Sequence, residues 1–222
     1  MELSITLVII IITVLISIGG FSNHKTIDDL IFYPPAITEQ KQWYRFFTSG
    51  LIHADWLHLI FNMFSLYLFG EYVEKNFVAD YATGEVLFGK QGRILYLVMY
   101  VLALFVCLLP TFIKHKNDYY YRSLGASGAV SAVIFAGLFI EPRNRVGLFF
   151  IPPIIPGYVF GPLYLILSSY LGKNSRDNVN HSAHFWGAVF GIVFVIVMAI
   201  ALKSEYKPIE YFILKVRSDL NL

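Results

Sequence analysis

Six apolar stretches limit what this 222-residue chain can fold into. Each carries few or no charged residues and is close to the length that a helix needs to cross a bilayer core of ~30 Å. We therefore predict an all-α fold, a polytopic bundle of transmembrane helices. The predicted spans lie at about 3–18, 57–72, 94–113, 124–140, 157–171 and 182–202.

The composition favours a membrane protein over a soluble domain. Hydrophobic residues make up 57% of the chain, charged residues only 14%, and the mean hydropathy is +0.62. The formal net charge of +2 is small and the basic residues are scattered, which argues against nucleic-acid binding. The one cysteine, Cys107, excludes an intramolecular disulfide. We expect a single membrane domain over residues 1–222 that ends in a short polar tail at 203–222.

The ends of the spans carry further information. No basic residue precedes the first span and no cleavage signal follows it, so we interpret it as a retained span rather than a signal peptide. Prolines crowd the start of the fifth apolar stretch, and its helix is expected to begin only near residues 157–162. Basic residues divide almost evenly between the two sides, and only the short connection with Arg143 and Arg145 favours an N-terminus inside.

Polar side chains within three of the spans indicate a functional site. His58 lies near the start of the second predicted span, Ser127 near the start of the fourth and His184 near the start of the sixth. These alternate spans cross in one direction, so the three side chains should lie at a similar depth near one membrane face. Because polar groups are costly in hydrocarbon, their presence there is a functional hypothesis by default.

Residue spacing suggests how these side chains meet. His58 and Asn62, four apart, share a helix face. His184, Gly187 and Gly191 share another, and glycines at such spacing let a second backbone approach closely. The fourth span begins with small residues that include Gly125 and Gly128, so the fourth and sixth spans can bring Ser127 against His184. Each of these residues taken singly also has a purely structural explanation. The small residues could serve helix packing, and the Ser127 hydroxyl could bond a carbonyl of its own helix. His184 or Asn62 could form a hydrogen bond that bridges two helices.

Four sequence motifs resemble those of the rhomboid family of intramembrane serine proteases. Gly125 to Gly128 is similar to the nucleophile motif G-x-S-G, and Ala183 to Gly191 is similar to A-H-x-x-G-x-x-x-G. The others are H-x-x-x-N at residues 58–62 and W-x-R at residues 43–45, with a glycine and a glutamate, Gly70 and Glu74, at the end of the second helix. The likeness covers residues 42–202 and fits the bacterial six-helix core of the family.

The resemblance implies a Ser-His dyad, with Ser127 as nucleophile and His184 as general base. It also implies oxyanion donors at His58, Asn62 and the Ser127 amide, and no metal or cofactor. Substrates would be single-span membrane proteins, cut in or beside their transmembrane segment, in a bacterial plasma membrane with the site open to the extracytoplasmic side. We expect water to reach the site through a polar cavity, and Trp43 and Trp56 to lie at the membrane interface. The expected lining of the cavity is His58, Asn62, Ser131 and Ser182.

Two features depart from the family pattern. Many relatives carry an aromatic residue four positions after the nucleophile, packed on the catalytic histidine, where this chain has Ser131. The connection at residues 75–92 is also longer than in compact relatives, and the sequence suggests no role for it.

Three other classes of function remain open from the sequence. A non-catalytic relative that binds transmembrane clients would be expected to lack the serine or the histidine, and this chain keeps both. A zinc site could use His181, His184 and His58 or His53, but no H-E-x-x-H motif is present. A transporter would be expected to show an internal repeat, and none is seen. The sequence does not indicate an oligomeric state.

Overall fold

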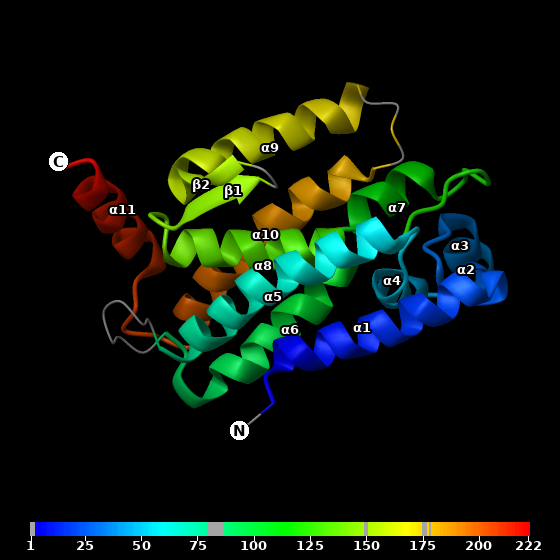
Figure 1. Cartoon of the computed structure of the whole chain (residues 1–222), viewed down its shortest axis with the longest axis horizontal. Coiled ribbons are helices and arrows are strands. Elements are labelled where there is room, and N and C mark those ends of the chain that lie inside the picture. The colour runs from blue at the N-terminus through cyan, green and yellow to red at the C-terminus, as the bar shows by residue number, and fades with distance from the viewer. Residues whose placement is uncertain (1–2, 80–86, 149–150, 175–176, 178) are drawn as a thin grey trace.

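The computed structural model describes residues 3–79, 87–148, 151–174, 177 and 179–222. Figure 1 shows a bundle in which the long helices run side by side along the longest axis of the molecule, so the all-α prediction is confirmed. The bounds of the elements, in chain order, are α1 Ile5–Ser22, α2 His24–Leu30, α3 Pro34–Gln40, α4 Arg45–Thr48, η1 Ser49–Leu51, α5 Trp56–Val78, η2 Gly89–Gln91, α6 Gly92–Val106, α7 Leu109–His115, α8 Ser127–Ile140, β1 Arg145–Leu148, β2 Ile151–Pro156, α9 Gly157–Asn174, α10 His181–Ala201 and α11 Pro208–Asp219.

Helix α8 forms the centre of the bundle. It is only 14 residues long and most of its side chains are buried. It packs most extensively against α10 and also against α5 and α6. The small side chains at its start make this close packing possible, because they leave room for neighbouring backbones. The surrounding helices, rather than lipid, therefore cover most of the helix that carries Ser127.

The predicted spans and the observed helices differ in detail. The predicted span 94–113 is divided into α6 and α7, and Pro110 lies in the first turn of α7, where its missing N–H costs nothing. Helix α5 continues past residue 72 to Val78. By length and composition, the described segments able to cross a membrane are Ile5–Ser22, Gly89–His115 and His181–Ala201. That α5, α8 and α9 also cross it stays a prediction.

A short antiparallel hairpin, β1 with β2, precedes α9 and was not predicted. The prolines at residues 152, 153 and 156 fall in β2, where they cannot interrupt a helix. Helix α9 then begins at Gly157, at the start of the range expected from the sequence.

The segment between α1 and α5 folds as short helices and lies at the end of the bundle where α5 begins (Figure 1). Arg45 is buried there and its Nη1 donates to the carbonyl oxygens of Asp28 and Ile31, each at 2.8 Å. This explains the arginine of the W-x-R motif, because its guanidinium ties α4 to the end of α2. Trp43 and Trp56 are 48% and 56% exposed, as interfacial side chains would be.

The polar tail expected at residues 203–222 instead contains helix α11. Figure 1 shows α11 at the far end of the bundle from α2, α3 and α4. The Nζ of Lys215, a buried side chain, donates to the carbonyl oxygen of Ile140 at 2.9 Å and lies 3.4 Å from Oε2 of Glu141. The tail therefore covers the C-terminal end of α8.

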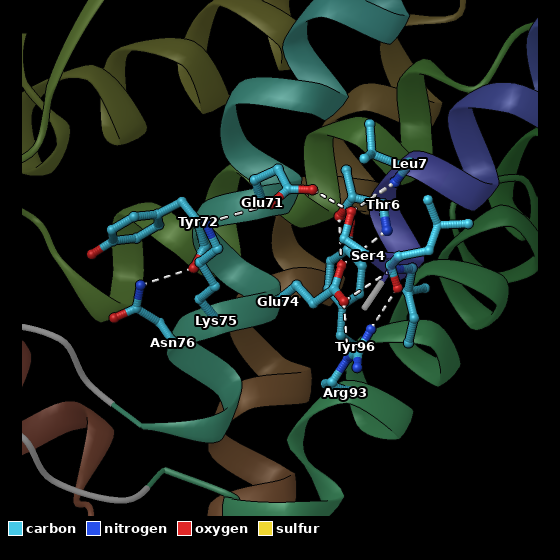
Figure 2. Close-up of polar contacts among 12 residues, drawn as sticks. Ser4, Thr6, Leu7, Glu71, Tyr72, Glu74, Lys75, Asn76, Arg93 and Tyr96 are labelled. Atoms are coloured by element: carbon cyan, nitrogen blue, oxygen red, sulfur yellow. Dashed lines mark hydrogen bonds and ion pairs between the residues drawn. The ribbon is translucent and has the colours of Figure 1, made fainter. Parts of the chain in front are cut away.

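The buried carboxylate of Glu74, near the C-terminal end of α5, joins α5 to α1 and α6 (Figure 2). Oε1 of Glu74 accepts a hydrogen bond from the amide of Ile5 at 2.9 Å, and its Oε2 accepts from the amide and the hydroxyl of Thr6. Arg93 Nε lies 3.1 Å from Oε1. The free amides at the start of α1, which carry partial positive charge, compensate the negative charge together with Arg93. The glutamate at the end of the second helix is thus a structural anchor.

We expect Glu74→Gln to lower the free energy of unfolding by about 1–3 kcal/mol, because the charge-assisted hydrogen bonds to α1 weaken. Thermal unfolding in detergent measures the change. The matched control is Glu210→Gln, since Glu210 pairs with Lys207 at the exposed surface, where such pairs contribute ~0–1 kcal/mol. Equal losses in the two variants would contradict an anchoring role.

Candidate active site

Ser127 and His184 lie in hydrogen-bond contact. Ser127 is the first residue of α8, His184 lies in the first turn of α10, and the distance from Oγ to Nε2 is 2.6 Å. The packing of α8 against α10 therefore brings together two side chains that are 57 residues apart in the sequence. A hydroxyl in contact with an imidazole nitrogen is the arrangement of an activated nucleophile and its base.

Two glycines on α10 allow this approach. A Cβ added at Gly187 would lie closer than 3.0 Å to the carbonyl oxygen of Gly128, and one added at Gly191 would meet that of Ala132 in the same way. Both clashing atoms belong to the backbone of α8, so rotation of a side chain cannot relieve the overlap. The small residues at these positions therefore set the separation of the two helices, and with it the distance between Ser127 and His184.

His58 contacts the loop that leads to Ser127. Gly125 has a φ of +111°, and a Cβ there would lie 2.7 Å from Cε1 and 2.8 Å from Nε2 of His58. The amide of Gly125 donates to the carbonyl oxygen of Ser49 at 2.8 Å, which fixes the loop. Glycine is required here both for the backbone conformation and for the space that the imidazole occupies. The ring edge of His58 thus points toward the residues just before Ser127.

Asn62 lies one turn further along α5 and is buried. Its Nδ2 donates to the carbonyl oxygen of His58 at 3.0 Å, a local bond within the helix. The start of α5 is capped by Asp55, whose Oδ1 accepts from the amide of His58 at 2.8 Å. Of the two residues expected to support the oxyanion, His58 is therefore held directly against the nucleophile loop, and Asn62 lies behind it.

Ser131, the residue that departs from the family pattern, bonds to a tyrosine on another helix. Its Oγ lies 3.0 Å from the hydroxyl of Tyr164 on α9, whose ring also contacts Phe135 on α8. An aromatic side chain is thus present at this level of α8, but α9 supplies it. The sequence analysis missed Tyr164, because no local pattern links residues 33 positions apart on different helices.

The start of α10 is fixed by its cap. Asn180 Oδ1 accepts from the amide of Ala183 at 3.0 Å and from the hydroxyl of Thr111 at 3.1 Å, so α7 holds the turn that carries His184. His181 pairs with Asp177 at 3.1 Å, and its ring lies edge-on to His184 with centroids 6.0 Å apart. His184 is thereby flanked by a polar group on its own helix.

A polar pocket of about 120 Å³ adjoins this end of α10. Of the four residues expected to line a water-filled cavity, Ser182 lines this pocket, whereas His58, Asn62 and Ser131 do not. Side chains from α7, α9 and α10 contribute to the lining, including Thr111, His115, Tyr121, Asn180 and His181. Ser127 and His184 are not among the lining residues, so the pocket borders the candidate site through His181.

The zinc hypothesis depended on imidazoles gathering around a single point. Within the parts of the chain that the structure describes, no three His, Cys, Asp or Glu side chains come together in a geometry that could hold a metal ion. The histidines pair instead, His53 with His58 and His181 with His184.

Burial holds His53 neutral. Desolvation, together with the nearby His58, lowers the pKa of His53 from 6.5 to about 3, and Asp55 opposes this only in part. The pKa of His53 is lower in the folded than in the unfolded chain, so protonation favours the unfolded chain. The free energy of unfolding therefore decreases as the pH falls from 6.5 toward 3.

We expect the unfolding temperature of the wild type to drop between pH 7 and pH 5, with His53 contributing about 1.4 kcal/mol per pH unit below its unfolded pKa. In His53→Gln the drop should be smaller, because that titration is removed. Thermal unfolding of both proteins across this range tests the expectation, and parallel curves would contradict it.

Comparison with known proteins identifies the family. The model of the rhomboid domain matches residues 40–201, which is most of the chain. The chain belongs to the rhomboid family. Similar proteins include RHOMBOID-like protein 12, mitochondrial, of Arabidopsis thaliana, 32% identical over 66% of this chain and 44% of its own length. Rhomboid protease GlpG of Haemophilus influenzae is 24% identical over 78% of this chain and 95% of its own length.

Membership confirms the family resemblance and places this rhomboid chain in a membrane as a multi-pass protein. The chain spans about half the length of the plant relatives it matches. Some relatives are named proteases, such as the putative rhomboid protease YdcA of Bacillus subtilis, and others only rhomboid-like. The prediction of a bacterial plasma membrane gains no support here, since relatives include mitochondrial and chloroplastic proteins.

Proposed function

We propose that this chain is an intramembrane serine endopeptidase that hydrolyses peptide bonds in or next to transmembrane segments of single-span membrane proteins. The observation that carries the proposal is the 2.6 Å contact between Ser127 Oγ and His184 Nε2. Ser127 and His184 both lie in the first turn of helices within the bundle, and a polar pair predicted to lie within a membrane is a functional hypothesis by default. The family includes intramembrane proteases of this type.

In the proposed reaction Ser127 Oγ attacks the substrate carbonyl carbon while its proton passes to His184 Nε2. The new C–O bond gives a tetrahedral oxyanion, and cleavage of the C–N bond then transfers that proton to the leaving amine. Water then attacks the acyl carbon and gives a proton to His184; the bond to Ser127 Oγ breaks, His184 returns the proton to that oxygen, and the carboxyl product leaves. Two-residue variants of the catalytic triad run the same chemistry.

The oxyanion would be stabilised from two directions. The oxyanion would form beside Ser127 at the start of α8, which is the positive end of the helix dipole, near the Ser127 amide. His58, held against Gly125, would donate from its ring, and Asn62 would support it from the next turn of α5. The pocket that Ser182 lines would supply the water for the second step.

The side of the membrane on which the site would open depends on the end of the bundle where the site lies. The N-terminal end of α1 and the site lie at opposite ends of the long helices (Figure 1). With the N-terminus inside, as the short connection with Arg143 and Arg145 suggests, the site would open on the extracytoplasmic side. Unwinding of the substrate helix there would expose its carbonyl groups to Ser127.

A fluorophosphonate probe tests the proposal directly. Folded wild-type protein in detergent should be labelled covalently and Ser127→Ala should not, and the wild type should cleave a model single-span substrate with or without a chelator. Absence of labelling and cleavage in folded wild type would overturn the proposal and favour a protein that binds transmembrane clients without cutting them. Cleavage that a chelator abolishes would favour metal chemistry.

A further inference from the structure

His53 is a buried imidazole with a defined partner on another helix. Its side chain is 0% exposed in the link between η1 and α5. Nδ1 lies 3.0 Å from the hydroxyl of Ser17 on α1, and that hydroxyl donates to the carbonyl oxygen of Leu51 at 2.9 Å. Helix α1 also packs on this end of the bundle through Phe21, whose ring centroid lies 4.9 Å from that of Trp56, but the bond from Ser17 is the contact that reaches the histidine beside His58.

These contacts determine the tautomer of His53. A serine hydroxyl has one proton, and Ser17 gives it to Leu51. Ser17 Oγ must therefore accept from His53, which places the imidazole proton on Nδ1. Nε2 then carries a lone pair, and within the described part of the chain it has no hydrogen-bond partner. Leaving such an acceptor buried is costly, which calls for a functional explanation.

The ring of His53 packs directly on His58. The centroids are 5.0 Å apart and the planes are inclined by 78°, an edge-to-face contact. The same ring also meets the backbone of Gly125 at its Cε1 and Nε2 atoms, where even a Cβ would collide with it. His58 is thus confined between a loop that leads to Ser127 and a histidine that cannot move without breaking its bond to Ser17.

We propose that His53, anchored by Ser17, is a positioning residue that holds the ring of His58 in the orientation from which it donates to the oxyanion. The inference rests on the proposed function, because it gives His58 its role in the reaction. It extends the site to α1, a helix that carries none of the family motifs in this chain. Without the anchor, the His58 ring would sample other orientations, and transition-state stabilisation would fall more than substrate binding.

Ser17→Ala and His53→Asn test the two halves of the link. Ser17→Ala removes the anchor and keeps the ring, whereas His53→Asn keeps a donor near the position of Nδ1 and removes the ring. We expect kcat to fall roughly tenfold in each with KM within about twofold, less than the ~10²–10³ loss from removing an oxyanion donor itself. The rate of fluorophosphonate labelling should fall in parallel in both variants. Ser17→Thr, which keeps the hydroxyl, should be labelled at the wild-type rate.

Thr13 provides the matched control. It is buried one turn before Ser17 on α1, and its hydroxyl has no partner within the described residues. Thr13→Val should leave kcat unchanged. If Ser17→Ala and His53→Asn match Thr13→Val in kcat and labelling rate at equal folded fraction, the residues only stabilise the fold and the inference is wrong.

Imidazole ¹⁵N NMR gives a readout that does not need activity. The ring signals of His58 should shift in Ser17→Ala and stay in place in Thr13→Val. Unchanged signals in Ser17→Ala would overturn the inference even in an active enzyme. A wild type that is neither labelled nor active would overturn the proposed function, and the His58 signals would still decide whether His53 positions that ring.

Discussion

Alanine at Ser127 is expected to slow peptide cleavage by ~10⁴-fold or more, with the bundle intact. The hydroxyl is the proposed nucleophile, and among the residues that the structure describes it is the group in hydrogen-bond contact with His184 Nε2, at 2.6 Å. Residual catalysis by the oxyanion donors and by binding accounts for any rate that remains. Cleavage of a model single-span substrate in proteoliposomes, with thermal unfolding as the measure of folding, provides the comparison.

His184→Asn should be nearly as inactive, and the double variant should be no worse than either single variant, because a nucleophile and its base act as one unit. Ser131→Ala is the matched control, since Ser131 lies one turn along the same helix and bonds to Tyr164 instead of His184. It should keep cleavage within about tenfold of the wild type. Additive losses for Ser127 and His184, or inactivity of Ser131→Ala alone, would contradict the assignment.

Gly187→Ala is expected to have the second largest effect. The added methyl group would overlap the carbonyl oxygen of Gly128, a backbone atom, so α10 and α8 must separate. Overpacking of this kind typically costs 1–3 kcal/mol of stability. A displacement of about 1 Å between reacting groups can cost ~10²-fold in rate, and we expect a loss of that order in the fluorophosphonate labelling of Ser127.

Gly19→Ala is the control for the glycine substitution. Gly19 lies in α1 with nothing within 4 Å of an added Cβ, so alanine there should be neutral or stabilise the helix by ~0.5–1 kcal/mol. Unfolding temperature and labelling rate are measured for both variants. If Ser127 is labelled in Gly187→Ala at the same rate as in Gly19→Ala, the glycine does not set the distance between Ser127 and His184.

The central part of the site was predictable from local spacing and depth. Ser127 and His184 lie near the starts of alternate apolar stretches, and helical periodicity places Gly187 and Gly191 on the face of His184. Period and depth are properties of single helices, and they require no knowledge of tertiary contacts. They were sufficient to predict that these two helices meet at Ser127, as the structure has it.

The remaining features depend on contacts between distant segments. The bond of Ser131 to Tyr164, the contact of His53 with Ser17 and the burial of Lys215 each join residues from different helices. Nothing in the local sequence around His53 distinguishes it from a polar loop residue. Helix α11 was interpreted as a polar tail because its charged residues are frequent, although one of them is buried against the end of α8.

The short length of α8 has a consequence for both faces of the membrane. At 1.5 Å per residue its 14 residues span about 21 Å, less than the ~30 Å of a hydrocarbon core. If α8 crosses the core as predicted, its two ends cannot both reach a membrane surface, and the unpaired backbone groups of an end that stays within the core need partners there. At the end of α8 away from Ser127, the ammonium of Lys215 is such a partner, because it donates to the carbonyl oxygen of Ile140. The short helix that carries Ser127 is thus closed at its opposite end by the chain's own C-terminal segment.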